Sequence, residues 1–185
     1  MMKKRQFIGI GLGVLLLSLA WILLTPVIFP PASASGAITA PHPGFKAPDF
    51  TLNTIEEEAI TLSDYRGKPV LVFLWASWCS VCKATMPGLQ EVYTDYHDQG
   101  FEILAVNTTF QDNLNTAISY FQAQGYTYPF LLDRDGAVSD AYKLHALPTA
   151  ILVRPDGIVQ DVVIGSGLSE GFLRAAIDGL IASEE

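Results

Sequence analysis

The segment that decides the fold runs from residue 70 to residue 82 and reads Val70-Leu71-Val72-Phe73-Leu74-Trp75-Ala76-Ser77-Trp78-Cys79-Ser80-Val81-Cys82. Its first six residues form a continuous apolar run, which is typical of a strand buried on both faces of a sheet. A helix is predicted from about Cys79 to Gln99, and Gly100 would end it. The two cysteines therefore lie where a buried strand gives way to a helix.

The position of Cys79 at the start of a helix favours its thiolate form. The first helical turn leaves backbone N–H groups unpaired and carries partial positive charge. A thiolate is stabilised there, and the thiolate is the form that attacks a disulfide. We therefore expect Cys79 to be the nucleophile. Cys82, one turn further along on the same side, would resolve the mixed disulfide.

Two other interpretations of the cysteine pair are weaker. A structural disulfide that closes so short a loop removes little entropy from the unfolded chain, so it stabilises little. A structural zinc ion needs further Cys or His ligands at suitable spacing. The chain has no other cysteine, and His42, His97 and His145 are scattered. We expect neither a metal nor another cofactor.

The first 30 residues have the features of a membrane anchor. Residues 3–5 are basic, and the stretch from Phe7 to Phe29 contains no charged residue. That stretch is long enough to cross a bilayer, and the basic residues before it favour a cytoplasmic N-terminus. The prediction is a single-pass cell-membrane protein whose remaining part is extracytoplasmic, periplasmic or external. The alternative is a secreted protein cleaved near Ala34, because residues 32–34 have the small-x-small pattern of a cleavage site.

Composition divides the rest of the chain in two. Residues 31–46 are rich in Pro, Ala, Ser and Gly and are predicted to be a flexible linker. Residues 47–185 are predicted to be one folded domain. Beyond residue 30 the chain carries 8 basic and 19 acidic residues. A domain with this excess of negative charge does not attract the phosphate backbone of nucleic acid. Nucleic acid is therefore not an expected partner.

The hydrophobic pattern predicts an α/β domain with a mixed central sheet flanked by helices. An N-terminal β-hairpin is expected around Phe50–Leu52 and Ile60–Leu62. The other expected strands are Phe101–Val106, Phe130–Leu132, Ala150–Val153 and Ile158–Ile164, and the other expected helices start near Asn113, cover Val138–Leu144 and include Leu173–Ile181. The last two strands are joined by Pro155-Asp156-Gly157, a strong hairpin turn.

Several segments resemble the thioredoxin-like proteins of the TlpA/ResA type, which are membrane-anchored thiol–disulfide oxidoreductases. The resemblance covers roughly Ala47 to Ile181. It rests on Phe73 to Lys83 around the cysteines, on Ala47-Pro48-Asp49-Phe50-Thr51-Leu52, on Leu62-Ser63-Asp64-Tyr65-Arg66-Gly67-Lys68-Pro69 and on Leu147-Pro148-Thr149. It implies a thioredoxin-like fold.

The resemblance also assigns residues that would position a partner. It implies that Leu147–Pro148 is a cis peptide facing the cysteines, and that the backbone of Leu147 pairs with an extended partner segment. The alternative for Pro148 is an ordinary proline at the start of a strand. Trp78 flanks the nucleophile. Its ring either shields the Cys79 sulfur or contacts a partner, and the alternative is that it only packs against the protein.

Two positions depart from the family pattern. Thioredoxins have a buried aspartate six residues before the first cysteine, where this chain has Phe73. Many ResA-like proteins have a glutamate three residues after the second cysteine, where this chain has Thr85. Deprotonation of Cys82 would then depend on water, Lys83 or the partner, and the redox potential does not follow from the sequence.

The preferred hypothesis is an enzyme that reduces disulfides in exported proteins, possible substrates including apocytochrome c. A membrane electron donor of unknown identity would supply its electrons. A disulfide-forming oxidase or isomerase is the main alternative. A copper-site assembly protein on the same fold is a further one, with His145 as the third ligand. A peroxiredoxin-type peroxidase is disfavoured, because no Pro-x-x-x-Thr/Ser-x-x-Cys segment leads to Cys79.

Overall fold

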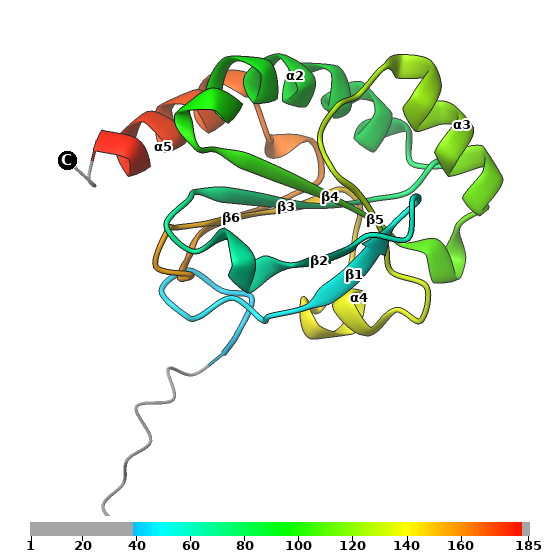
Figure 1. The fold of residues 1–185 in the computed structure, drawn as a ribbon, viewed down its shortest axis with the longest axis horizontal. Coiled ribbons are helices and arrows are strands. Elements are labelled where there is room, and N and C mark those ends of the chain that lie inside the picture. The colour runs from blue at the N-terminus through cyan, green and yellow to red at the C-terminus, as the bar shows by residue number, and fades with distance from the viewer. Residues whose placement is uncertain (1–38, 183–185) are drawn as a thin grey trace, which may run out of the picture. The chain divides into compact units, whose positions relative to one another are not determined.

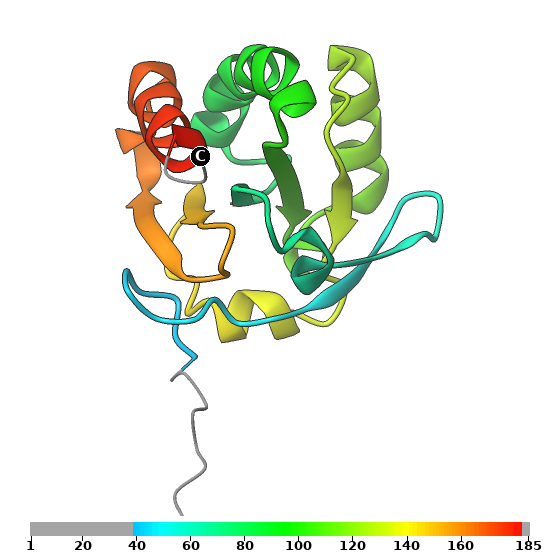
Figure 2. The same ribbon diagram turned by 60° about the vertical axis from the view of Figure 1, so that its left-hand side comes forward.

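The computed structural model describes residues 39–182, which form a seven-stranded sheet with helices on both faces (Figure 1, Figure 2). The strands are β1 (Thr51–Thr54), β2 (Ala59–Thr61), β3 (Val70–Trp75), β4 (Glu102–Asn107), β5 (Phe130–Leu132), β6 (Thr149–Val153) and β7 (Val159–Ile164). The α-helices are α2 (Ser80–Tyr96), α3 (Leu114–Gln124), α4 (Ala137–Ala141) and α5 (Glu170–Ala182).

The sheet has the strand order β2-β1-β5-β4-β3-β6-β7. β3, β4 and β5 are parallel to one another, while β6 pairs antiparallel with β3 and with β7. The predicted mixed sheet is thus confirmed. β1 pairs antiparallel with both β2 and β5, so these two strands widen the sheet beyond β5.

The central strand β3 divides the core into two layers, because its side chains alternate between the faces of the sheet. Leu71, Phe73 and Trp75 pack with buried residues of α2, α3 and α5. Val70, Val72 and Leu74 pack in a second cluster that includes residues of α4. All six residues are buried, as the continuous apolar run predicts.

Most element boundaries lie within a residue or two of the prediction. α2 begins directly after Cys79, and a 3₁₀ turn over His97–Gln99 ends at Gly100, whose φ of 95° suits glycine. α4 is shorter than the expected helix over Val138–Leu144. It ends early because Lys143 adopts a left-handed backbone conformation with φ of 51°. That residue type gives no sequence signal for such a conformation.

The predicted linker extends too far at its carboxyl end. The backbone of residues 44–47 is hydrogen-bonded to β7 and to the turn before it. Gly44 N–H donates to the carbonyl of Val159 at 2.9 Å, Val159 N–H donates to that of Phe45 at 2.8 Å, and Ala47 N–H donates to that of Gly157 at 3.0 Å. Composition predicts loop residues correctly but does not reveal these pairings with a segment more than 100 residues away. Residues 31–38 lie outside the described part.

The membrane prediction also concerns residues that the structure does not describe. Neither the proposed anchor over residues 1–30 nor the alternative cleavage near Ala34 falls within residues 39–182. None of the helices in that described range has the length and apolar character needed to span a bilayer.

Candidate active site

The two cysteines lie at the carboxyl end of the central strand and are joined by a disulfide. Cys79 is the N-cap residue of α2, where the sequence places it, and Cys82 lies in the first turn. Cys79 keeps 6% of its surface exposed, whereas Cys82 is fully buried against the core. An incoming thiol therefore reaches Cys79 and not Cys82.

The sulfur of Cys79 accepts a hydrogen bond from the backbone N–H of Cys82 at 3.0 Å. That amide is one of the donors that the first turn of a helix leaves without a backbone partner. A negative charge on this sulfur would be stabilised by the same hydrogen bond and by the helix dipole. The local geometry thus contains the feature on which the predicted reactivity of Cys79 depends.

Two tryptophans near the cysteines have opposite environments. Trp75 is fully buried, and its ring contacts those of Tyr120, Phe121 and Phe130. Trp78 is 59% exposed, and its indole N–H donates to the carbonyl of Gln111 at 3.3 Å. Plain packing therefore does not account for Trp78, which presents an apolar ring to solvent beside the disulfide.

Leu147–Pro148 is a cis peptide, as the resemblance implies. β6 begins at Thr149, which pairs with Leu74 near the end of β3, so the cis peptide lies at the same edge of the sheet as the cysteines. The carbonyl of Pro148 accepts a hydrogen bond from Gly165 N–H at 2.8 Å. Within the described part of the chain, the backbone N–H and C=O of Leu147 have no hydrogen-bond partner.

A groove of about 380 Å³ separates Trp78 from the segment that contains the cis peptide. Its lining includes Trp78 and Phe110 together with His145, Ala146 and Leu147. Phe110 is half-exposed and was given no role by the sequence analysis. An extended segment in this groove would pass close to the unpaired backbone of Leu147.

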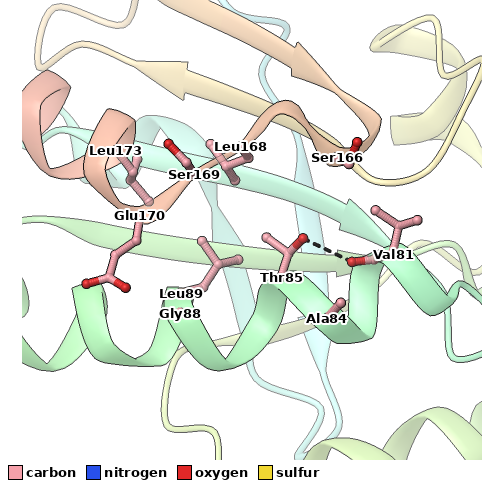
Figure 3. Close-up of a pocket in the computed structure, with 10 residues that line it drawn as sticks. All are labelled: Val81, Ala84, Thr85, Gly88, Leu89, Ser166, Leu168, Ser169, Glu170 and Leu173. Carbon is pink, nitrogen blue, oxygen red and sulfur yellow. Dashed lines mark hydrogen bonds between the residues drawn. The ribbon is translucent and has the colours of Figure 1, made fainter.

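A second groove of about 290 Å³ lies between α2 and the start of α5 (Figure 3). It contains Thr85, whose hydroxyl donates to the carbonyl of Val81 at 3.0 Å. Glu170 also lines this groove, but its carboxylate is ion-paired with Arg174 at 2.8 Å. The other departure from the family, Phe73, is fully buried. Neither position supplies an acid to Cys82.

The copper alternative requires Cys79, Cys82 and His145 to come together. No three potential ligands among His, Cys, Asp and Glu are grouped for a metal ion within residues 39–182. His145 instead lines the groove beside Trp78. The structure therefore offers this alternative no ligand set in the part of the chain that it describes.

Sequence reasoning missed one polar residue at the site. The carboxylate of Asp112 accepts hydrogen bonds from both the backbone N–H and the hydroxyl of Ser77, each at 2.6 Å. Ser77 lies two residues before Cys79, so Asp112 contacts the loop that presents the nucleophile. The two residues are 35 positions apart, and only the parallel pairing of β3 with β4 brings them together.

Comparisons with known proteins agree with this geometry. Residues 43–162 match the AhpC/TSA family. The chain is 37% identical to the thiol-disulfide oxidoreductase ResA of Geobacillus thermodenitrificans, over 91% of this chain and 94% of that protein. It is 34% identical to ResA of Bacillus subtilis, over 89% of this chain and 87% of that protein.

Solved structures show the same fold. A putative thiol:disulfide interchange protein DsbE from Chlorobium tepidum superposes with a TM-score of 0.70 at 26% identity, over 76% of this chain and 98% of that one. StoA from Bacillus subtilis superposes with a TM-score of 0.62 at 26% identity, over 69% of this chain and 95% of that one. With its Cys79–Cys82 pair at the start of α2, the chain belongs to the AhpC/TSA family as a ResA-like thiol–disulfide oxidoreductase.

Proposed function

We propose that this protein reduces disulfides in exported proteins, with Cys79 as the attacking thiolate and Cys82 as the resolving thiol. The observation that carries the proposal is the contrast between the two sulfurs. Cys79 is the one with exposed surface, and its sulfur accepts the Cys82 amide at the helix N-terminus. Cys82 is buried behind it, within reach of the Cys79 sulfur.

The reaction proceeds in two exchanges. The Cys79 thiolate attacks one sulfur of the partner's disulfide, forms a mixed disulfide, and releases the other partner sulfur as a thiolate. Cys82 then loses its proton to solvent and attacks the Cys79 sulfur. The partner leaves as a dithiol after protonation, having gained two electrons, and the enzyme is left with the Cys79–Cys82 disulfide that the structure contains. A membrane electron donor of unknown identity returns the enzyme to its dithiol form.

The partner is held as an added strand beside the cis peptide. The backbone N–H and C=O of Leu147, which have no partner in the described part of the chain, pair with an extended segment of the substrate. Pro148 fixes that backbone at the edge of the sheet, and Trp78 offers an exposed ring to an apolar side chain. Apocytochrome c, with its paired cysteines, fits this substrate class.

Residues 1–30 hold the domain at the outer face of the cell membrane in this proposal. The uncharged stretch from Phe7 to Phe29 supports an uncleaved anchor. Cleavage near Ala34 would release the same domain on the same side of the membrane, so the proposed chemistry is the same in both cases.

Equilibration of the purified protein with glutathione tests the direction of electron flow. A reductase has a reduction potential well below that of the glutathione couple. The Cys79–Cys82 pair of a reductase therefore stays oxidised in glutathione buffers that reduce the disulfide of an oxidase. A potential well above that couple would instead assign the protein to disulfide formation or isomerisation.

Mixed-disulfide trapping tests the roles of the two cysteines. Cys82→Ala removes the resolving thiol, so Cys79 should accumulate covalent adducts with exported proteins in intact membranes. The matched control is Cys79→Ala, which removes the nucleophile and should give almost no adducts. Equal trapping by both variants would overturn the assignment of Cys79. In a separate arm, retention of Cu(I) by the reduced protein through a desalting column would favour the copper alternative.

A further inference from the structure

The loop between β3 and Cys79 is held by a single carboxylate from a distant part of the chain. Asp112 Oδ2 accepts from the backbone N–H of Ser77, and Asp112 Oδ1 accepts from the Ser77 hydroxyl, both at 2.6 Å. Ser77 is almost fully buried, so its two donors have little access to competing water, whereas Asp112 is partly exposed. Both donors of Ser77 are thus fixed by the two oxygens of one side chain.

The same carboxylate is itself fixed by two further donors. The side-chain amide of Asn107 donates to Asp112 Oδ2 at 2.8 Å, and the backbone N–H of Asn113 donates to Asp112 Oδ1 at 2.8 Å. Asn107 is fully buried at the end of β4, directly beside Trp75 in the sheet register. Asn113 is the N-cap of α3. Asp112 therefore ties the active-site loop to the end of β4 and to the start of α3.

Trp78 is held by Gln111, the residue that precedes Asp112. Its indole N–H donates to the carbonyl of Gln111 at 3.3 Å, so the two residues before Cys79 are both bound by residues 111–112. Cys79 follows directly, and its own N–H donates to the carbonyl of Ala76 at 3.1 Å. The conformation of residues 76–78 thereby determines where the Cys79 sulfur lies relative to the amide of Cys82.

We propose that Asp112 is a positioning residue for disulfide exchange, which acts through Ser77 to keep the sulfur of Cys79 on the amide of Cys82. Asp112 makes no contact with either sulfur in this arrangement. Its effect on reactivity comes from the loop that it holds. The inference rests on the proposed role of Cys79 as nucleophile.

The alkylation rate of Cys79 as a function of pH tests the inference, measured on the reduced full-length protein with Cys82→Ala as background. In Asp112→Ala the loop loses both Ser77 hydrogen bonds to the carboxylate, the bonds from Asn107 and Asn113 are lost as well, and the thiolate loses its fixed donor. We expect the pH of half-maximal alkylation to rise by about one unit, which makes the reaction at a pH below that midpoint about tenfold slower. Ser77→Ala, which removes only one of these bonds, should give a smaller shift in the same direction.

Asp112→Asn separates positioning from charge. Removing a nearby negative charge by itself would favour the thiolate and lower the pH of half-maximal alkylation. Loss of positioning raises it, because an amide has one acceptor oxygen where the carboxylate has two. A downward shift in Asp112→Asn and in Asp112→Ala would overturn the proposal. An additive effect of Asp112→Ala and Ser77→Ala would also contradict it, because residues that act through one contact are not additive.

Asp49 provides the matched control. Its Oδ1 accepts from the backbone N–H of Ser63 at 3.0 Å and from that of Phe50 at 3.1 Å, and Phe50 packs on the face of the sheet opposite the cysteines. Asp49→Ala should lower thermal stability and leave the alkylation profile unchanged. If the reference protein itself shows the profile of an ordinary thiol, the proposed function fails. If its thiol is reactive and Asp112→Ala leaves it so, only the role of Asp112 fails.

Discussion

Two buried tyrosine hydroxyls differ in whether they have a partner. The hydroxyl of Tyr128 has no hydrogen-bond partner in the described part of the chain, although the residue is almost fully buried among aromatic rings. Burial raises the pKa of Tyr128 well above its usual value, so the hydroxyl stays neutral. An unsatisfied buried hydroxyl costs free energy, so Tyr128→Phe should stabilise the fold by roughly 1 kcal/mol. Urea denaturation of the oxidised protein measures this.

Tyr142→Phe is the matched comparison for that variant. The hydroxyl of Tyr142 is also buried but donates to the carbonyl of Pro48 at 2.8 Å. Its removal leaves a buried carbonyl without this donor, so the same chemical change should destabilise the fold by roughly 1–2 kcal/mol. Effects of equal sign in the two variants would contradict the difference in hydrogen bonding.

Glu102 makes stability depend on pH. Burial at the start of β4 raises the pKa of this carboxyl, although the backbone N–H of Ile103 donates to it at 3.0 Å. The pKa of Glu102 is higher in the folded protein than in the unfolded chain. The contribution of its protonated carboxyl to stability is therefore fully present below the unfolded pKa and is lost as the pH rises through the folded pKa. Glu102→Gln should therefore gain stability relative to the parent protein as the pH rises from 4 to 7. Thermal melts across this range test it, and a constant difference would contradict it.

The residues of the site differ in how far the sequence predicts them. Trp78, Cys79 and Cys82 lie within five consecutive positions, so one motif places all three beside the start of a helix. Asp112 has no such motif, because its partner Ser77 lies 35 positions earlier and the contact depends on the register of β3 with β4. Phe110 was missed for the same reason. A long-range contact becomes visible only once the strand order is known.

Elements formed by local signals are predicted better than their arrangement. β3 follows from its apolar run, and α3 follows from Asn113, whose Oδ1 accepts from Thr116 N–H at 2.9 Å, and from Gly125 with its φ of 70°. The pairing of β1 with β5 does not follow, because it joins residues almost 80 positions apart. The folded state of residues 44–47 depends likewise on backbone bonds to the β6–β7 hairpin.

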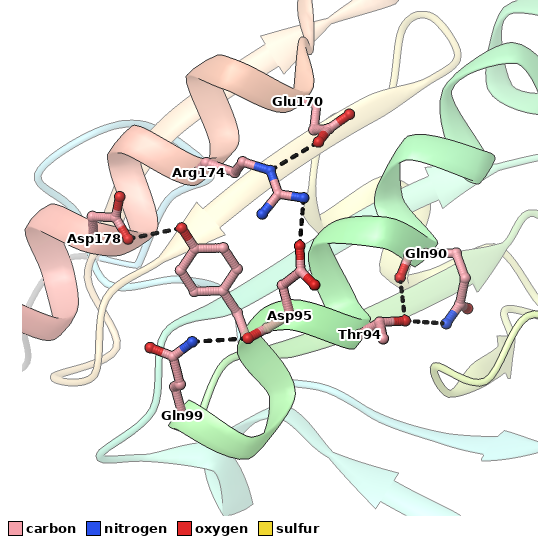
Figure 4. A network of polar contacts seen from close by, with 8 residues as sticks. Gln90, Thr94, Asp95, Gln99, Glu170, Arg174 and Asp178 are labelled. Carbon is pink, nitrogen blue, oxygen red and sulfur yellow. Dashed lines mark hydrogen bonds and ion pairs between the residues drawn. The ribbon is translucent and has the colours of Figure 1, made fainter.

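Helix α5 is attached to α2 by both apolar and ionic contacts. Its buried residues are Leu173, Ile177 and Leu180. On the surface, Arg174 is ion-paired with Asp95 at 2.7 Å and with Glu170 at 2.8 Å (Figure 4). All three ionic side chains are partly exposed, and pairs of that kind contribute little to stability.

The relative strength of these contacts is testable by two substitutions on one helix. Ile177→Ala leaves a cavity at a fully buried position and should cost about 2–5 kcal/mol. Arg174→Ala removes the ion pairs and should cost clearly less. Denaturation of both variants at low and high salt measures the difference, and salt should alter only the ionic contribution. A larger loss for Arg174→Ala would show that the polar network is what holds α5 in place.

At the scale of the whole domain, the disulfide and the fold are thermodynamically linked. Cys79 and Cys82 belong to the same buried cluster as residues of α2, α3 and α5, so the disulfide is a bond within the core. In a closed cycle, the difference in unfolding free energy between oxidised and reduced protein equals the difference in reduction free energy between folded and unfolded chain. About 1.4 kcal/mol corresponds to 30 mV for this two-electron couple.

This linkage gives a prediction that is independent of any partner protein. A reductase favours its own disulfide form, so the oxidised protein should unfold at a higher urea concentration than the reduced protein at pH 7. Burial of the disulfide in the core supports this direction, while stabilisation of the Cys79 thiolate by the helix opposes it. The variant with both cysteines replaced by alanine should respond to neither oxidant nor reductant. A reduced protein that is the more stable form would mean that the helix N-terminus dominates, and that electrons flow from partners to this enzyme.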